Sequence, residues 1–158
     1  GHFDAIDHVM TYFFAGVEGL KGLNDLSDAL GDAGRKVALL PPVQRGVFAV
    51  QDKIAAARVK VGADVLPWWP ARGVYLLLEQ GESAPHGLLD TPCVAGVWSA
   101  DGKDGQRITY CFLDDDPVLA ADQLREPLEK RWRTSGVEPL LAAPFHLVVP
   151  YEWDRYVP

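Results

Sequence analysis

The pattern of apolar and polar positions along the chain predicts a protein of mixed strands and helices. Residues 7–14 and 107–113 are rich in β-branched and aromatic side chains, as strands are. Each run precedes a stripe of apolar residues at helical spacing. The two stripes are Leu20, Leu23, Leu26 and Leu30, and then Val118, Ala121, Leu124, Leu128 and Trp132. Residues 72–79, which read RGVYLLLE, form a nearly continuous apolar run that is typical of a buried central strand.

Glycine, proline and acidic residues mark the ends of both predicted helices. Gly31 and Gly34 are expected to end the first helix. Three aspartates followed by a proline, at 114–117, predict the start of the second helix. A capping carboxylate accepts hydrogen bonds from free backbone N–H groups, and proline fits the first turn. Pro127 should kink the second helix or end its regular part.

The middle of the chain is predicted to be mostly strand and loop. Residues 93–99 form a strand candidate, and two Asp-Gly pairs favour a hairpin turn between it and residues 107–113. Residues 51–65 are ambiguous, because one part is alanine-rich like a helix and another alternates like a strand; we favour a strand with a bulge or a long hairpin. Residues 67–70 and 81–92 contain many breaker residues and are expected to be loops.

Two parts of the chain resemble each other, which indicates an internal repeat. A Thr-Tyr-Phe-Phe sequence at 11–14 returns as Thr-Tyr-Cys-Phe at 109–112, and the leucines of the two helical stripes fall at equivalent offsets. Both copies are predicted to have the order strand, helix, strand, with the final strands at 46–50 and 145–149. The sequence therefore predicts one domain, residues 1–158, built of two pseudo-repeats at about 3–80 and 92–158. Chance similarity is the alternative, since the identities are few.

Two strand–helix–strand copies with extra strands between them resemble the ferredoxin-like architecture, in the tandem form of the dimeric α+β-barrel superfamily. The resemblance implies an α+β barrel or sandwich with a mainly antiparallel sheet and a cavity shared by the two halves. Members of that superfamily include cofactor-free polyketide cyclases, lactone isomerases, small monooxygenases and haem-handling enzymes. No motif of this sequence maps onto their catalytic residues, so the resemblance implies a small-molecule pocket but no particular reaction.

Composition excludes several classes of partner. Twenty-two acidic and fifteen basic residues give a net charge of −7, which has the wrong sign for binding nucleic acid or an anionic membrane. Cys93 and Cys111 belong to no ligand pattern of the kind that binds structural zinc, so we expect no metal site. No apolar run approaches the roughly 18–20 residues that span a bilayer, and no signal-peptide pattern is present. We therefore expect a cytoplasmic protein.

Histidines and tyrosines are the candidates for proton transfer. His8 is expected to share one strand face with Tyr12, as a mostly apolar pocket with a few polar groups requires. Tyr12 and Tyr110 occupy equivalent places in the repeat, so both phenols would point into one cavity if the halves face each other. His146, which interrupts the last apolar run, is a further candidate. The alternatives are a core histidine bonded to a backbone carbonyl and tyrosines that only fill space.

Aromatic and charged residues are the candidates for ligand binding. The segment 151–156 is too rich in aromatic side chains for a disordered tail, so we expect it to dock against the domain. The alternative for this segment is a strand end or a self-association surface, because Trp, Tyr and Arg are typical interface anchors. A Pro-Trp-Trp-Pro loop at 67–70 is compatible with the lip of a pocket, a dimer contact or a loop plug, and the sequence does not choose among them. The expected substrate-binding residues are Trp69, Trp98, Glu152, Trp153 and Arg155.

The leading functional hypothesis is a small cofactor-independent enzyme that catalyses proton transfer on an apolar or aromatic carbonyl-type small molecule, as an isomerase, lyase or cyclase does. The alternatives are a non-catalytic carrier or sensor of small molecules, and a haem-binding or monooxygenase-type protein. A homodimer is compatible with each of them. The sequence identifies neither the reaction nor the ligand.

Overall fold

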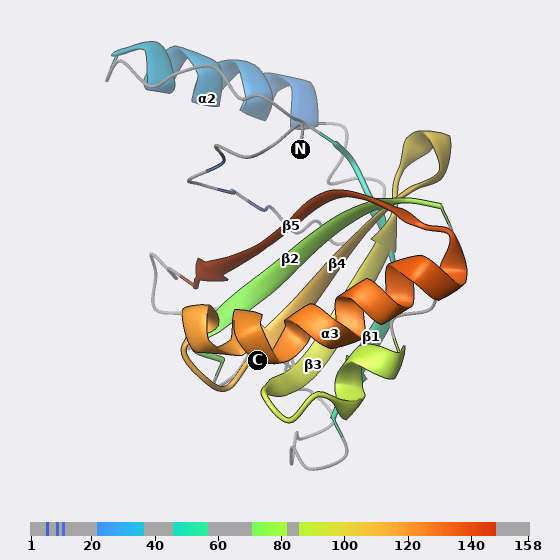
Figure 1. The fold of residues 1–158 in the computed structure, drawn as a ribbon. Coiled ribbons are helices and arrows are strands. Elements are labelled where there is room, and N and C mark those ends of the chain that lie inside the picture. Colours follow the sequence, from blue (N-terminus) through green and yellow to red (C-terminus); the bar gives the residue numbers. More distant parts are fainter. Residues whose placement is uncertain are drawn as a thin grey trace. The chain divides into compact units, whose positions relative to one another are not determined.

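The computed structural model describes residues 22–36, 46–56, 71–81 and 86–147, together with Ile6, Val9 and Thr11. These residues divide into two compact units, one within Ile6–Gly46 and one that contains all the strands (Figure 1). No helix among them is long and apolar enough to cross a membrane. In chain order the elements are α2 (Leu23–Lys36), β1 (Ala49–Ala55), β2 (Gly73–Gln80), η1 (His86–Asp90), β3 (Val94–Asp101), η2 (Lys103–Gly105), β4 (Gln106–Leu113), α3 (Pro117–Ser135) and β5 (Glu138–His146).

The five strands form an open antiparallel sheet in the order β1-β3-β4-β2-β5. Both β4 and β5 run antiparallel to β2, so they are parallel to each other, and α3 connects them across the strand that separates them. This unit has the order strand, helix, strand that the sequence predicts for the second copy, but its last strand covers 138–146 and not the predicted 145–149. The predicted first strand of the other copy lies almost wholly outside the described residues. The α+β class is therefore confirmed, whereas the tandem repeat and the barrel stay predictions.

The strands β2 and β3 are buried on both faces, and α3 crosses one face of the sheet (Figure 1). On the α3 face, Leu77 and Cys111 pack with Leu124 and Leu128 of the helix. The opposite face carries a second set of buried apolar side chains, among them Leu76, Leu78, Trp98 and Phe112. A strand that is buried on two sides needs apolar residues at consecutive positions. This requirement explains why residues 72–79 read as one apolar run.

The predicted start of α3 is confirmed. The carboxylate of Asp116 accepts hydrogen bonds from the backbone N–H groups of Val118, at 2.9 Å, and Leu119, at 3.4 Å. Pro117 occupies the first turn, where its missing N–H costs nothing. At the other end, Gly136 adopts a left-handed conformation and its N–H donates to the Trp132 carbonyl, as a C-terminal cap does.

Two details predicted for α3 differ in the structure. Of the two effects expected of Pro127, an end of the regular helix is wrong: the helix continues to Ser135, and the flanking Leu124 and Leu128 are fully buried on both sides of the proline. Val118 is 64% exposed and does not belong to the buried stripe. It lies one residue, about 100° of rotation, beyond the buried Pro117, so it points away from the sheet.

The predicted end of α2 is also wrong. The helix passes through both Gly31 and Gly34 and ends at Lys36. Glycine lowers helix stability by only about 1 kcal/mol per residue relative to alanine, so it does not force an end. Arg35 and Lys36 lie in the last turn, where positive charge is favourable.

The predicted strands of the middle region are confirmed. The β3–β4 turn uses positive φ at Asp104 (58°) and Gly105 (73°), as an Asp-Gly pair favours. Within the ambiguous segment 51–65, residues 51–55 belong to β1, which has an irregularity between Val50 and Asp52. Of the predicted loop 81–92, residues 86–90 form the short helix η1.

Candidate functional site

A groove lies between α3 and β2 on the helix-covered face of the sheet. Its volume is about 170 Å³. A cavity of about 150 Å³ holds a benzene ring, whereas drug-sized ligands need about 300–1,000 Å³. The groove therefore has room for one ring with small substituents. It is lined by Tyr75, Ala121, Arg125, Leu128, Glu129 and Trp132.

The register of β2 and the turn of α3 bring these side chains together. Tyr75 lies on the face of β2 that carries Leu77, because alternate residues of a strand share a face. Ala121, Arg125 and Leu128 are spaced by four and three residues, so they lie on one side of α3. Ala121 has only a methyl group, which leaves the space beside the tyrosine open.

The Tyr75 hydroxyl is a neutral hydrogen-bond donor at physiological pH. Tyr75 is only 9% exposed. This burial raises the pKa of its hydroxyl above the ordinary value of 10, and the nearby Cys111 adds to the rise while Arg125 partly opposes it. A buried phenol usually has a hydrogen-bond partner, so a ligand oxygen in the groove would meet a donor.

A buried ion pair fixes one wall of the groove. The Arg131 guanidinium donates to both carboxylate oxygens of Glu79, from Nε at 3.1 Å and from Nη2 at 2.8 Å. The indole Nε1–H of Trp132 donates to the same carboxylate at 2.8 Å. The Glu79 and Arg131 side chains are 1% and 9% exposed. The Trp132 indole is therefore oriented by one hydrogen bond to a carboxylate that two hydrogen bonds from Arg131 hold in place.

Two side chains of opposite charge stand at the mouth of the groove. Arg125 and Glu129 are both exposed and lie four residues apart on α3. Arg125 forms an ion pair with Asp122, and both partners are about 70% exposed. Exposed pairs of this kind contribute about 0–1 kcal/mol. Arg125 can therefore exchange Asp122 for a ligand carboxylate at little cost.

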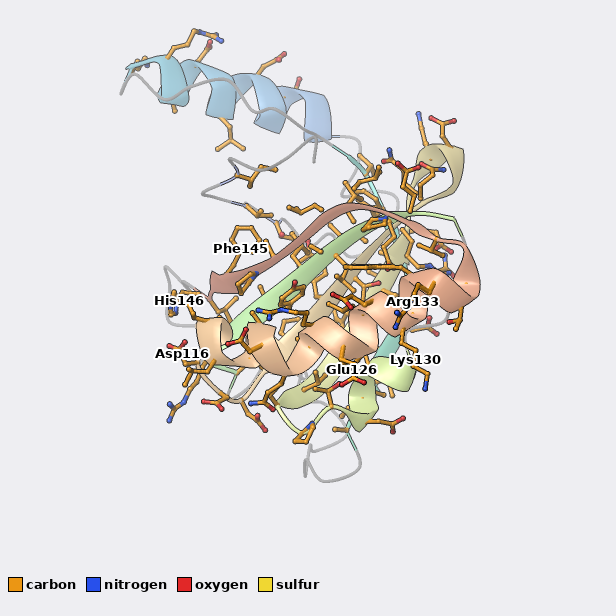
Figure 2. The ribbon with its side chains drawn as sticks, in the orientation of Figure 1. Asp116, Glu126, Lys130, Arg133, Phe145 and His146 are labelled. Atoms are coloured by element: carbon orange, nitrogen blue, oxygen red, sulfur yellow. The ribbon has the colours of Figure 1, made fainter. Side chains whose placement is uncertain are left out.

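The remaining charges of α3 point away from this groove. Figure 2 shows Glu126, Lys130 and Arg133 on the outward side of the helix. All three residues are exposed, and none of them lines the groove. They provide matched surface positions for control substitutions.

The structure brings together two residues that the sequence nominates for the site, Tyr110 and Trp98, but on the opposite face of the sheet. They are cross-strand neighbours on β4 and β3. The Phe112 ring stacks on Tyr110, with centroids 6.3 Å apart, and meets Trp98 edge-on at 5.9 Å. The Lys53 ammonium lies 4.7 Å from the centre of the Trp98 ring. These aromatic rings form one cluster that is separated from the groove by the sheet.

The structure does not bring His146 to either Tyr110 or Trp98. His146 is exposed at the end of β5 (Figure 2) and pairs with Gly73, whereas Tyr110 pairs with Leu76. Positions 73 and 76 of β2 lie on opposite faces, so the two predicted catalytic side chains do as well. The other predicted site residues lie outside the described residues and stay predictions: His8, Tyr12, Trp69, Glu152, Trp153 and Arg155.

The sequence interpretation missed the residues that line the groove. A signal for Tyr75 is present, because Tyr75 and Glu79, which bonds to the lining residue Trp132, are polar-tipped side chains of an otherwise apolar run and share one strand face. No local signal indicates that Ala121 and Arg125 lie above Tyr75, since this contact depends on how α3 crosses the sheet.

Among the described residues, no group of three or more His, Cys, Asp or Glu side chains could hold a metal ion. The groove presents a phenol, an indole, a guanidinium and a carboxylate around a small space that Ala121 and Leu128 also line. Comparison of the chain with protein-family models, with curated proteins and with solved structures finds no match.

Proposed function

We propose that this protein binds a small molecule that has a single flat ring and an acidic or carbonyl oxygen, in the groove between α3 and β2. The observation that carries the proposal is the Tyr75 phenol, which is buried at a ring-sized space beside Arg125. A mostly apolar pocket with a few convergent polar groups is the usual form of a small-molecule site.

Each kind of lining residue has a role in this proposal. Leu128 and the Trp132 indole offer apolar surface to the ligand ring, and aromatic pairs add about 0.5–1.5 kcal/mol beyond the area that they bury. The Tyr75 hydroxyl and the Arg125 guanidinium are donors for the ligand oxygen. These two donors suit an anionic or carbonyl oxygen.

The groove favours a carrier or sensor over an enzyme. The described residues that line it include no histidine, burial raises the pKa of its phenol above the ordinary value, and its one carboxylate, Glu129, is exposed at the mouth beside Arg125. The proton-transfer hypothesis depends on His8 and Tyr12, which lie outside the described residues, and it stays a separate prediction. Loss of turnover in a His8→Gln variant that keeps its melting temperature would support that hypothesis.

Isothermal titration with benzoate tests the binding proposal, with acetate as the ligand that lacks the ring. Tyr75→Phe keeps the aromatic ring and removes the hydroxyl donor, so it should weaken benzoate binding about two- to twelvefold, as for one hydrogen bond of about 0.5–1.5 kcal/mol. Ala121→Leu should fill the groove and abolish binding. Glu126→Gln, on the outward side of α3, is the control and should leave binding unchanged.

The melting temperature of each variant shows that a loss of binding is not a loss of fold. Two results would contradict the proposal. One is that benzoate, like acetate, shows no binding. The other is that benzoate binds equally well to the native chain, to Tyr75→Phe and to Ala121→Leu, which would place the ring elsewhere.

A further inference from the structure

We infer that the ligand of the groove is a zwitterion: a ring that bears a carboxylate for Arg125 and, on the same edge, an ammonium for Glu129. The inference rests on the proposed function and adds the charge pattern that the site selects. Arg125 and Glu129 line the same groove and carry opposite charges.

The spacing of the two charges sets the spacing of the ligand groups. Residues i and i+4 of a helix are neighbours on its surface, with Cβ atoms about 5–6 Å apart. Substituents at positions 1 and 3 of a six-membered ring project from the same side of the ring, so both can reach the mouth while the rest of the ring enters the groove. Substituents at positions 1 and 4 point in opposite directions and cannot both do so.

The two charges also select against ligands with one charge. A simple acid places its carboxylate near Arg125 but also near the Glu129 carboxylate, which repels it. A simple amine has the same conflict with Arg125. A zwitterion satisfies both side chains, and the repulsion of the wrong charge adds to the discrimination.

The test compares 3-(aminomethyl)benzoate with its 4-isomer, with benzoate and with benzylamine by isothermal titration. The 3-isomer should bind about three- to fivefold more tightly than benzoate, the gain expected when an exposed ion pair contributes up to about 1 kcal/mol. The 4-isomer should show no such gain. Glu129→Gln should remove the gain of the 3-isomer, whereas Glu126→Gln should preserve it.

The outcomes separate this inference from the proposed function. If benzoate binds, is lost in Ala121→Leu, and binds as tightly as the 3-isomer, then the zwitterion is wrong and the groove remains a site for ring acids. The same conclusion follows if the gain of the 3-isomer survives in Glu129→Gln. If none of the four compounds binds, the proposed function fails together with the inference.

Discussion

Replacement of Glu79 by glutamine tests the most heavily buried charge of the described structure. The change keeps the shape of the side chain and removes its negative charge. Arg131 then remains as a buried cation opposite a neutral amide. The Glu79 carboxylate accepts three hydrogen bonds, two from Arg131 and one from Trp132, whereas the glutamine amide has one oxygen to accept them. We expect a large loss of stability, because burial leaves the cation little water to compensate.

The magnitude follows from the burial of the pair. Removing one partner of a buried ion pair costs about 3–5 kcal/mol, and Glu79 and Arg131 are 1% and 9% exposed. Whole domains are stable by only about 5–15 kcal/mol. For a chain of this size each kcal/mol lowers the melting temperature by about 2–4 °C, so Glu79→Gln should lower it by roughly 10 °C.

Urea denaturation gives the free energy of unfolding of Glu79→Gln and of a matched control. The control is Asp122→Asn, which breaks the Arg125–Asp122 pair on the same helix, where both side chains are about 70% exposed. It should change stability by at most about 1 kcal/mol. A double variant with methionine at 79 and 131 removes both charges and should be more stable than either single methionine variant.

A loss below about 1 kcal/mol in Glu79→Gln, similar to that of the control, would refute the reasoning, since it would mean that water reaches the pair. If Glu79→Gln does not fold, the double methionine variant still decides the matter. A double variant that is no more stable than the singles would mean that an uncompensated charge is not the source of the loss.

Three further predictions concern local packing and pH. Gly73→Ala should destabilise the fold by about 1–3 kcal/mol in urea denaturation, because a Cβ there would overlap Pro117 and lie 2.7 Å from the Phe145 carbonyl oxygen. Asp116→Ala should cost about 1 kcal/mol through the lost helix cap, and Asp116→Asn should restore most of it. Burial raises the pKa of the Cys111 thiol from 9.0 to about 12, so between these values the unfolded chain loses a proton that the folded chain keeps. The free energy of unfolding should therefore fall by about 1.4 kcal/mol per pH unit above pH 9, and a Cys111→Ala variant should lack this part of the slope.

The elements that the sequence predicts well are those with a strong local signal. The run at 72–79 contains enough apolar residues to require burial on both faces, and it forms β2. Asp116 accepts hydrogen bonds from the first free N–H groups of α3 and Pro117 begins the helix, so the start depends on contacts within three residues. The glycines of α2 led to a wrong prediction of its end, because each lowers the stability of the helix only modestly and does not terminate it.

The groove could not be predicted, because it depends on contacts between segments that are distant in the sequence. Tyr75 comes from β2, which pairs with β4 and β5 and not with β3, the next strand in the chain. Nothing near Tyr75 in the sequence indicates this placement. The separation of Tyr110 from His146 has a similar cause. Tyr110 pairs with Leu76 and His146 pairs with Gly73, and these positions of β2, which are far from both residues in the sequence, lie on opposite faces.

The role of the Glu79–Arg131 pair is better explained by the groove than by stability. Two well-packed apolar residues in place of a buried ion pair are often as stable or more stable, since each charge loses its hydration on burial. What they cannot supply is an acceptor for the Trp132 indole N–H, which donates to Glu79. A buried N–H without an acceptor costs about 1–3 kcal/mol, and the ring could avoid this cost by turning toward water through the groove that it lines. The indole would then occupy the space that we assign to the ligand ring, so the carboxylate at position 79 keeps that space open.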